Sequence, residues 1–206
     1  LIPRFYDATA GTVLVDGLDV REYTFDALYN KLGYVTQKAV LFSGTVEDNV
    51  FFGQSAAEKT DASLQAALSL SQAAEFVDKY PEKAAHPIAQ LGRNVSGGQK
   101  QRLSIARALA RTPEILIFDD SFSALDYKTD AVLREGLAKE LPDTTKIIVA
   151  QRISTIRNAD QILVLDRGEI AGLGTHDALM ASCTVYREIA MSQLSEEELK
   201  KGGASK

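Results

Sequence analysis

The sequence predicts an α/β fold in which parallel strands alternate with helices. Three short, continuous apolar runs, at 115–118, 146–150 and 161–165, are typical of strands buried on both faces of a parallel sheet. Helical patterns lie between them, at about 128–141 and 153–157. Strands and helices that alternate in this way imply a sheet covered by helices on both faces.

Further elements are expected on either side of this alternating region. Residues 11–20 predict a hairpin that turns at Asp16-Gly17, 32–35 predict a strand entering the core, and 166–169 predict a second hairpin turn followed by a strand at 170–172. From Thr45 to about Ala110 the pattern is helical and polar. A last amphipathic helix is expected over 177–193, and a polar, disordered tail over 195–206.

Composition excludes several classes of protein. The chain has 206 residues and a net charge of −5, which argues against the basic face of a nucleic-acid-binding protein, so no nucleic-acid partner is expected. Cys183 is the single cysteine, which rules out an intrachain disulfide and favours a small buried side chain. No apolar run approaches the ~18–20 residues that span a bilayer. Because the chain opens without methionine, we interpret it as part of a longer protein.

The segment Ser96-Gly97-Gly98-Gln99 has the features of a helix start. Ser96 can cap the helix, and Gln99 stands three residues later, where a capping box requires it. The two glycines leave the backbone open to the approach of another molecule, and a helix N-terminus attracts anions. A plain capped helix after a glycine turn would also explain these residues taken alone.

Paired acids follow the apolar run at 115–118. Asp119 and Asp120 therefore stand at the carboxyl end of a predicted buried strand, which is where open α/β sheets bind ligands. In P-loop NTPases an aspartate at this place holds Mg²⁺, which neutralises charge on the phosphates of the nucleotide. A solvated acidic turn is the alternative reading of a lone pair of acids.

Together with Ser123-Ala124-Leu125-Asp126, these segments resemble an ABC ATPase over about residues 1–190. The resemblance implies a P-loop NTPase (RecA-like) core with an antiparallel β portion and an inserted α-helical subdomain at about 45–110. It also implies a single ATPase domain over 1–194, with ATP and Mg²⁺ as cofactors.

The resemblance implies roles for individual residues. Asp119 resembles the Walker B aspartate that holds Mg²⁺, and Asp120 stands where the family has its general-base glutamate. Gln37 matches the Q-loop glutamine, which touches Mg²⁺ and the attacking water. Asp126 matches the D-loop aspartate, which contacts the opposite subunit. Ser96, Gly97, Gly98 and Gln99 match the signature segment, which closes over the γ-phosphate held by a partner domain.

Two further segments resemble exporters whose membrane helices precede the ATPase. They are 41–50 followed by Gly53, and Leu1-Ile2-Pro3-Arg4-Phe5-Tyr6-Asp7, which is similar to the end of the helix after the phosphate loop. This resemblance implies an ATP-driven motor domain on the cytoplasmic face of the membrane, tethered through a transmembrane portion outside this sequence. An importer ATPase or a DNA-repair ATPase is the alternative.

The sequence departs from the family pattern at three places. It contains no G-x-x-x-x-G-K-[ST], which we expect a few residues before Leu1, so these 206 residues alone should bind ATP very weakly. Asp120 replaces the usual glutamate, and a misplaced base typically costs ~10²–10⁴ in rate. Gln151 replaces the switch histidine and cannot carry a proton. The histidines present, His86 and His176, are expected to be structural or exposed.

The replacements at Asp120 and Gln151 would both weaken the same chemical step. They therefore favour the hypothesis that this chain is the less active subunit of an asymmetric pair of ATPases. In that hypothesis this chain supplies Ser96–Gln99 to an active site and Asp119, Asp120 and Gln151 to a quiet one, beside a different ATPase subunit. A homodimer that uses Asp120 as a slow base remains open, as do a nucleotide clamp with little hydrolysis and a soluble ABC ATPase acting on DNA or ribosomes.

Overall fold

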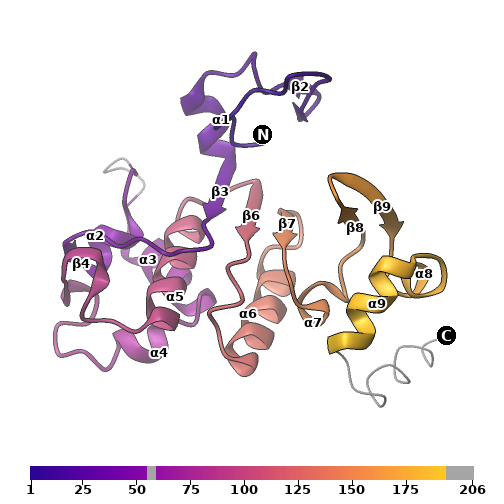
Figure 1. Cartoon of the computed structure of the whole chain (residues 1–206). Coiled ribbons are helices and arrows are strands. Elements are labelled where there is room, and N and C mark those ends of the chain that lie inside the picture. Colours follow the sequence, from indigo (N-terminus) through magenta and orange to yellow (C-terminus); the bar gives the residue numbers. More distant parts are fainter. Residues whose placement is uncertain (55–58, 194–206) are drawn as a thin grey trace. The chain divides into compact units, whose positions relative to one another are not determined.

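The computed structural model describes residues 1–54 and 59–193, and the chain divides into two compact units, Leu1–Val149 and Ala150–Lys206 (Figure 1). The tail predicted for 195–206 lies outside the described residues. Within them, no helix combines the length and the apolar character that a membrane span requires.

The strands of the first unit are β1 (Leu14–Val15), β2 (Leu18–Asp19), β3 (Leu32–Val35), β4 (Gly44–Thr45), β5 (Pro87–Ile88), β6 (Ile115–Asp119) and β7 (Thr145–Val149). Its α-helices are α1 (Phe25–Lys31), α2 (Val46–Val50), α3 (Asp61–Leu70), α4 (Ala74–Val77), α5 (Gly97–Leu109) and α6 (Tyr127–Glu140).

A parallel sheet in the order β3-β6-β7 lies at the centre of the first unit (Figure 1). Leu32 pairs with Ile115 and Val35 with Phe118, so β3 and β6 end at the same edge. Leu116 and Phe118 are fully buried, as the apolar run predicts, whereas β7 is only half-buried. The strands predicted at 32–35, 115–118 and 146–150 are confirmed.

Helices α2, α3 and α5 pack with the sheet into one apolar core that includes Val50, Leu68, Leu103 and Phe118. Their starts are encoded locally: α2, α3 and α5 each begin with a reciprocal capping box. Such a box satisfies two backbone donors that a helix start otherwise leaves without partners. Between 45 and 110 the chain is mostly helical as expected, but it also contains β4 and β5, which form an antiparallel pair.

The hairpin predicted at 11–20 is present as β1 and β2. Asp16 and Gly17 both have positive φ, at 50° and 78°, which a two-residue hairpin turn of type I′ requires. Lys31 contacts the carboxylates of Asp16 at 2.9 Å and Glu114 at 2.8 Å. The lysine therefore ties the hairpin to the strand that leads to Asp119.

The second unit corrects two expectations. It contains α7 (Ile153–Ile156), β8 (Ile162–Asp166), β9 (Glu169–Gly174), α8 (His176–Ser182) and α9 (Thr184–Gln193). The apolar run at 161–165 is not a buried parallel strand, because β8 pairs antiparallel with β9 and exposes Leu163 and Leu165. An apolar run without polar alternation gives no sign of which face is exposed.

The single helix predicted over 177–193 is two helices. Cys183 takes an extended conformation, with φ −108° and ψ 109°, and separates α8 from α9. Its buried side chain packs beside Gly172 of β9, where an added Cβ would lie 3.0 Å from the sulfur. The break lets both helices pack their apolar sides in one small core with β8, and the prediction that Cys183 is buried is confirmed.

Candidate functional site

Asp119 and Asp120 lie where β6 ends, beside the end of β3. The parallel register places Val35 opposite Phe118, so the residues that follow each strand meet at one edge of the sheet. We call this region, comprising residues 34–37, Asp119 and Asp120, the carboxyl edge. It has the position in which open α/β sheets bind ligands.

Four consecutive residues from the end of β3 are each joined to another element. The Tyr34 hydroxyl donates to Oδ2 of Asp119 at 2.9 Å, and the Gln37 amide donates to Oδ2 of Asp120 at 3.1 Å. Between them, the backbone oxygens of 35 and 36 accept from the side chains of Ser121, at 3.3 Å, and Gln101, at 3.3 Å. The structure therefore places the side chain of Gln37 against Asp120, the residue that follows Asp119.

Asp120 is held by its backbone as well as by its side chain. Its N–H donates to the carbonyl of Val149 at 2.9 Å, and its own carbonyl accepts from the hydroxyl of Ser123 at 2.7 Å. Its φ is 47°, in the left-handed region, which aspartate adopts more readily than most residues. This turn fixes the direction in which the carboxylate leaves the strand.

The signature segment, Ser96–Gln99, forms the start of α5. The Gln99 N–H donates to Oγ of Ser96 at 3.2 Å, and the Ser96 N–H donates to Oε1 of Gln99 at 2.8 Å. This capping box confirms the local structure predicted from the sequence. The first N–H groups of a helix have no partner within it, so the backbone of Gly97 and Gly98 forms the anion-attracting end of α5.

The two glycines of this segment are not required by packing within the chain. A Cβ added to Gly97 would meet no atom within 4 Å, and one added to Gly98 would meet only the carbonyl oxygen of Ala124, at 3.5 Å. Neither glycine has the positive φ that favours glycine. Packing and backbone conformation among the described residues therefore leave room for a side chain at both positions.

Asp126 has a structural task in this chain. Its carboxylate caps α6 by accepting from the Thr129 N–H at 2.9 Å and from the Thr129 hydroxyl at 2.8 Å. The backbone hydrogen bond from Thr129, and then the one from its hydroxyl, lower the pKa of Asp126. The residue is exposed, so the cap leaves its outer side open to contact.

Gln151 belongs to the second unit, where its side chain is exposed. Its carbonyl accepts from the Gln193 amide at 2.8 Å, and the same side chain of Gln193 accepts from the Ile153 N–H at 2.9 Å. Gln193 therefore fastens both sides of the turn that carries Gln151 to α9.

Both histidines have structural surroundings, as predicted. His86 stacks on Tyr80, with ring centroids 3.7 Å apart, and its Nδ1 lies 3.1 Å from Oε2 of Glu82. His176 is buried and its Nδ1 lies 2.8 Å from the hydroxyl of Tyr186. Burial, followed by the charge of Arg157, lowers the pKa of His176.

Sequence reasoning missed the polar side chains that hold the predicted residues in place: Tyr34, Gln101, Ser121 and Gln193. A signal existed for two of them. Tyr34 stands in a buried strand three residues before Gln37, and Gln101 falls on the inner face of α5, where a polar residue needs a partner. For Gln193, 42 residues from Gln151, the sequence offered none.

The donors at the carboxyl edge suit a hard cation that also binds phosphate. In the described part of the chain, no three His, Cys, Asp or Glu side chains converge as a complete metal site. Mg²⁺ does not need one, because it is usually held by one or two carboxylates together with substrate phosphates and water. The carboxylate of Asp119 and the amide oxygen of Gln37 fit that requirement.

Comparisons with known proteins agree with this geometry. A family model described as ABC transporter matches residues 1–123. An uncharacterized ABC transporter ATP-binding protein of Mycobacterium tuberculosis is 48% identical over 94% of this chain and 33% of its own length. A putative multidrug export ATP-binding/permease protein of Bacillus subtilis is 41% identical over 92% of this chain and 32% of its own. A bacterial Atm1-family ABC exporter, solved with ATP bound, matches with a TM-score of 0.89 and 36% identity over 95% of this chain and 34% of that one.

The fold and the site together define an ATP-binding domain of the P-loop NTPase class. The chain belongs to the ABC transporter family, and several of its relatives are exporters by name. It spans about a third of the length of the relatives it matches. ATP-binding domains of this family bind nucleotide together with Mg²⁺.

Proposed function

We propose that this chain is the ATP-driven motor domain of an exporter, tethered through a membrane portion to the cytoplasmic face of a membrane. The observation that carries the proposal is the carboxyl edge, where Gln37, Asp119 and Asp120 meet through the register of β3 and β6. Because the 206 residues contain no G-x-x-x-x-G-K-[ST], we expect them to bind ATP very weakly by themselves.

Each residue at the carboxyl edge has a proposed task. Asp119 and the oxygen of Gln37 would hold Mg²⁺, which would supply charge neutralisation at the phosphates. Asp120 would accept a proton from the attacking water, and Gln37 would orient that water. The contact between Gln37 and Asp120 supports this pairing, because it shows that the two side chains reach the same small region.

We propose that the signature segment acts on a nucleotide held by a second ATP-binding domain. The support is that Gly97 and Gly98 serve no packing purpose in their own chain, while the start of α5 attracts anions. Asp126 lies beyond the cap of α6 on an exposed surface, and we assign it a contact with the same second domain.

We further propose that this second domain is a different subunit and that the site built on Asp120 hydrolyses ATP slowly. Aspartate is one methylene shorter than glutamate, and hydrogen bonds hold the backbone of Asp120 in its turn, so the backbone does not bring the shorter carboxylate outward. Gln151 cannot carry a proton. A nucleotide-holding site with little hydrolysis is the second function that these two residues favour.

Turnover of ATP by the full-length protein alone tests this pair of functions. We compare the unaltered protein with the double variant Asp120→Glu plus Gln151→His. Near-zero turnover that rises about 100-fold or more in the double variant supports a slow site. Brisk turnover by the unaltered protein alone would show that Asp120 is a working base and would favour a homodimer.

A matched control makes the same chemical changes elsewhere. Asp143→Glu plus Gln161→His alters two exposed residues, each outside the carboxyl edge. This control should leave turnover unchanged. A rise in the control as large as that in the test variant would assign the gain to charge or stability and would remove Asp120 and Gln151 from the account.

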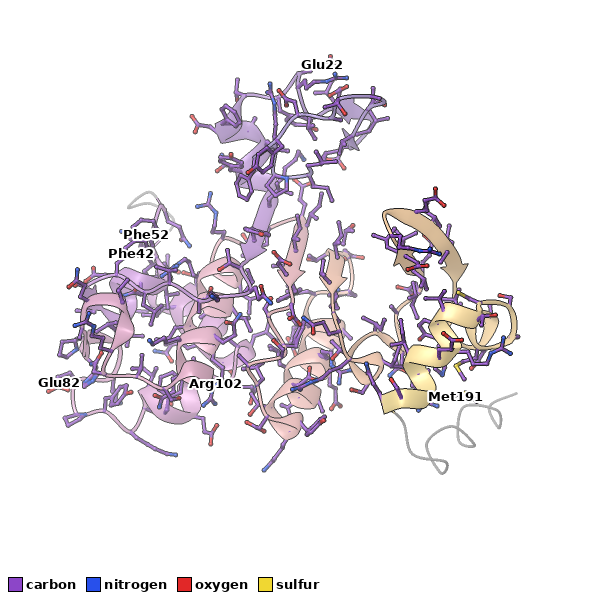
Figure 2. The ribbon with its side chains drawn as sticks, viewed as in Figure 1. Glu22, Phe42, Phe52, Glu82, Arg102 and Met191 are labelled. Atoms are coloured by element: carbon purple, nitrogen blue, oxygen red, sulfur yellow. The ribbon has the colours of Figure 1, made fainter. Side chains whose placement is uncertain are left out.

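The surface around Phe42 and Phe52 is the proposed contact with the membrane portion. These rings stack with centroids 4.3 Å apart although 43% and 50% of the residues' surfaces are exposed, and Figure 2 shows them side by side. The guanidinium of Arg107 lies 5.4 Å and 5.6 Å from the two centroids and donates to the carbonyl of Asn49 at 2.7 Å. Exposed aromatic pairs on a rigid support are typical of protein–protein contacts.

If this contact exists, a variant that lacks it should hydrolyse ATP without transporting a substrate. Phe42→Ala plus Phe52→Ala should retain ATP turnover but lose transport across a vesicle membrane, because the motor no longer reaches its membrane portion. Leu163→Ala removes an equally exposed apolar side chain of β8 and serves as the control. Transport that proceeds normally in the double variant would exclude this surface.

A further inference from the structure

Tyr34 makes a contact that neither the predicted site residues nor the proposed roles include. Its register partner on β6 is Ile117, and Asp119 stands two residues further along the same strand. Residues two apart on a strand project from the same face, so the tyrosine and Asp119 share one face of the sheet. A long aromatic side chain can span the diagonal between them, and the hydroxyl lies 2.9 Å from Oδ2 of Asp119.

The ring of Tyr34 is held in place on two sides. It packs against the apolar cluster that contains Leu32 and Ile117, and the ring of Phe5 meets it edge-on, with centroids 5.6 Å apart and planes at 73°. Because the ring is fixed, the hydroxyl offers its proton in one direction. The bond to Oδ2 therefore sets the rotation of the Asp119 carboxylate.

The bond leaves room for a cation. An ionised carboxylate offers about four lone-pair sites, so a single donor on Oδ2 leaves Oδ1 and the second lone pair of Oδ2 available. A phenol hydroxyl carries one proton, and a carboxylate can only accept, so the hydroxyl is the donor in this pair.

We propose that Tyr34 is a positioning residue that orients the carboxylate of Asp119 toward the divalent cation of the bound nucleotide. This inference rests on the proposed function, since it assumes that Asp119 meets Mg²⁺. Partners that orient a metal ligand are commonly worth about 10–100-fold in metal affinity. A tyrosine that served only as packing would contribute nothing to that affinity.

The test measures metal binding rather than turnover. Full-length protein is saturated with a non-hydrolysable ATP analogue and titrated with Mn²⁺, and free Mn²⁺ is read by electron paramagnetic resonance. Tyr34→Phe keeps the ring and removes the hydroxyl, and we expect it to raise the Kd for Mn²⁺ about 10-fold. Affinity for the analogue in EDTA should change less than about two-fold, because the metal is then absent and Tyr34 itself is not proposed to contact nucleotide.

Tyr23→Phe is the matched control. Tyr23 belongs to the same apolar cluster and its hydroxyl donates to the carbonyl of Val15 at 3.0 Å, away from Asp119. Both affinities should stay at the wild-type value in this variant. An unchanged Mn²⁺ affinity in Tyr34→Phe, or an equal loss in Tyr23→Phe, would overturn the inference.

A second measurement shows whether the hydroxyl acts through Asp119. In an Asp119→Asn background, Tyr34→Phe should cause no further loss of Mn²⁺ affinity, and a full further loss would contradict the proposed route. If wild-type protein binds the analogue but Tyr34→Phe has no effect, only this inference fails. If wild-type protein binds neither analogue nor metal, the proposed function fails and Tyr34 loses its role with it.

Discussion

The carboxyl edge and the signature segment are built in opposite ways. At the carboxyl edge, four consecutive residues are joined by hydrogen bonds to β6, to the turn after it and to α5. The signature segment bonds chiefly to itself, through the capping box of Ser96 and Gln99, and its glycines have open space around them. The first region is completed by its own chain, whereas the second presents a surface that another molecule can complete.

This difference predicts that the same substitution will have different consequences in the two regions. A change at the glycines of the signature segment should harm function and spare folding, because almost nothing in the chain packs against them. A change at the carboxyl edge should harm folding as well, because the strands and α5 depend on one another there. Four substitutions can break or sharpen this contrast.

The largest effect is expected from Gly97→Ala. The added methyl meets no atom of the chain within 4 Å, and alanine favours a helix over glycine, so stability should not fall. The methyl would stand where another molecule must approach the start of α5, and a small misplacement there can cost about 100-fold in rate. Steady-state ATP turnover of the full-length protein together with its partner subunit measures the loss, and hydrogen exchange of α5 should be unchanged. Turnover near the wild-type rate would show that the signature segment takes no part in ATP hydrolysis.

Gly33→Ala, in β3 just before the carboxyl edge, should harm folding. A Cβ at Gly33 would lie 2.7 Å from Cδ2 of Leu116, 2.8 Å from Cγ of Pro113 and 3.1 Å from the carbonyl oxygen of Ala108. Overpacking of this kind typically costs about 1–3 kcal/mol. Hydrogen–deuterium exchange of peptides from β3 and β6 should therefore accelerate. Protection equal to that of the unaltered protein would mean that the sheet is more adaptable than its packing indicates.

Gln101→Met tests the link between the two regions. The Gln101 side chain is buried and donates from α5 to the carbonyl of Thr36 at 3.3 Å. Methionine keeps the length and removes the donor, which should cost about 1 kcal/mol and loosen the segment that carries Gln37. Faster exchange at 34–37 with unchanged exchange in the first turn of α5 would confirm the link. Unchanged exchange in both segments would show that the bond from Gln101 to the Thr36 carbonyl does not restrain residues 34–37.

Asp126→Ala is expected to have the smallest effect on folding, confined to the first turn of α6. The alanine variant loses the carboxylate that accepts from the Thr129 N–H, whereas Asp126→Asn retains an oxygen that can accept from this N–H. Faster exchange in that turn should appear in the alanine variant and not in the asparagine variant. If both variants lose ATP turnover while only the alanine variant loses the helix cap, Asp126 also acts beyond its own chain. If neither variant loses turnover, Asp126 serves only to cap α6.

The pH dependence of this cap follows from the pKa of Asp126, which is lowered from its ordinary value of 3.8. A lowered pKa means that the folded state favours the carboxylate. The contribution of the cap is therefore fully present above about pH 3.8 and is lost as the pH falls through the lower folded value. Exchange in the first turn of α6 should accelerate over that acidic range in the unaltered protein and not in Asp126→Asn.

Local chemistry and strand ends could be predicted from the sequence because they depend on neighbours along the chain. The capping box at Ser96, the hairpin at Asp16-Gly17 and the buried strand that ends at Asp119 follow from short patterns of neighbouring residues. The sequence indicates that Gln101 needs a partner but not which one, and it gives no sign of the bond from Gln193, because these bonds join residues 65 and 42 positions apart.

The errors in the second unit have the same origin. The hairpin turn predicted at 166–169 does join β8 to β9, but the periodicity of the apolar run did not show that one face of β8 is exposed. The break at Cys183 likewise arises from packing against Gly172, which precedes it by a turn and a whole helix.

Site-directed crosslinking can show directly whether the signature segment meets a second ATP-binding domain. Arg93→Cys places a thiol on an exposed residue beside the segment, whereas the native Cys183 is buried. Exposed cysteines elsewhere in the full-length protein and its partner are replaced first, so that a photoreactive label attaches at residue 93. Glu22→Cys, on the exposed surface of the N-terminal region (Figure 2), is the labelled control.

With purified full-length protein and its partner subunit, we predict that ATP induces a crosslink from residue 93 to a second ATP-binding domain and none from residue 22. Mass spectrometry of the product would show whether that domain is another copy or a different subunit. Crosslinks that form only within the same chain, or equally without ATP, would contradict the account.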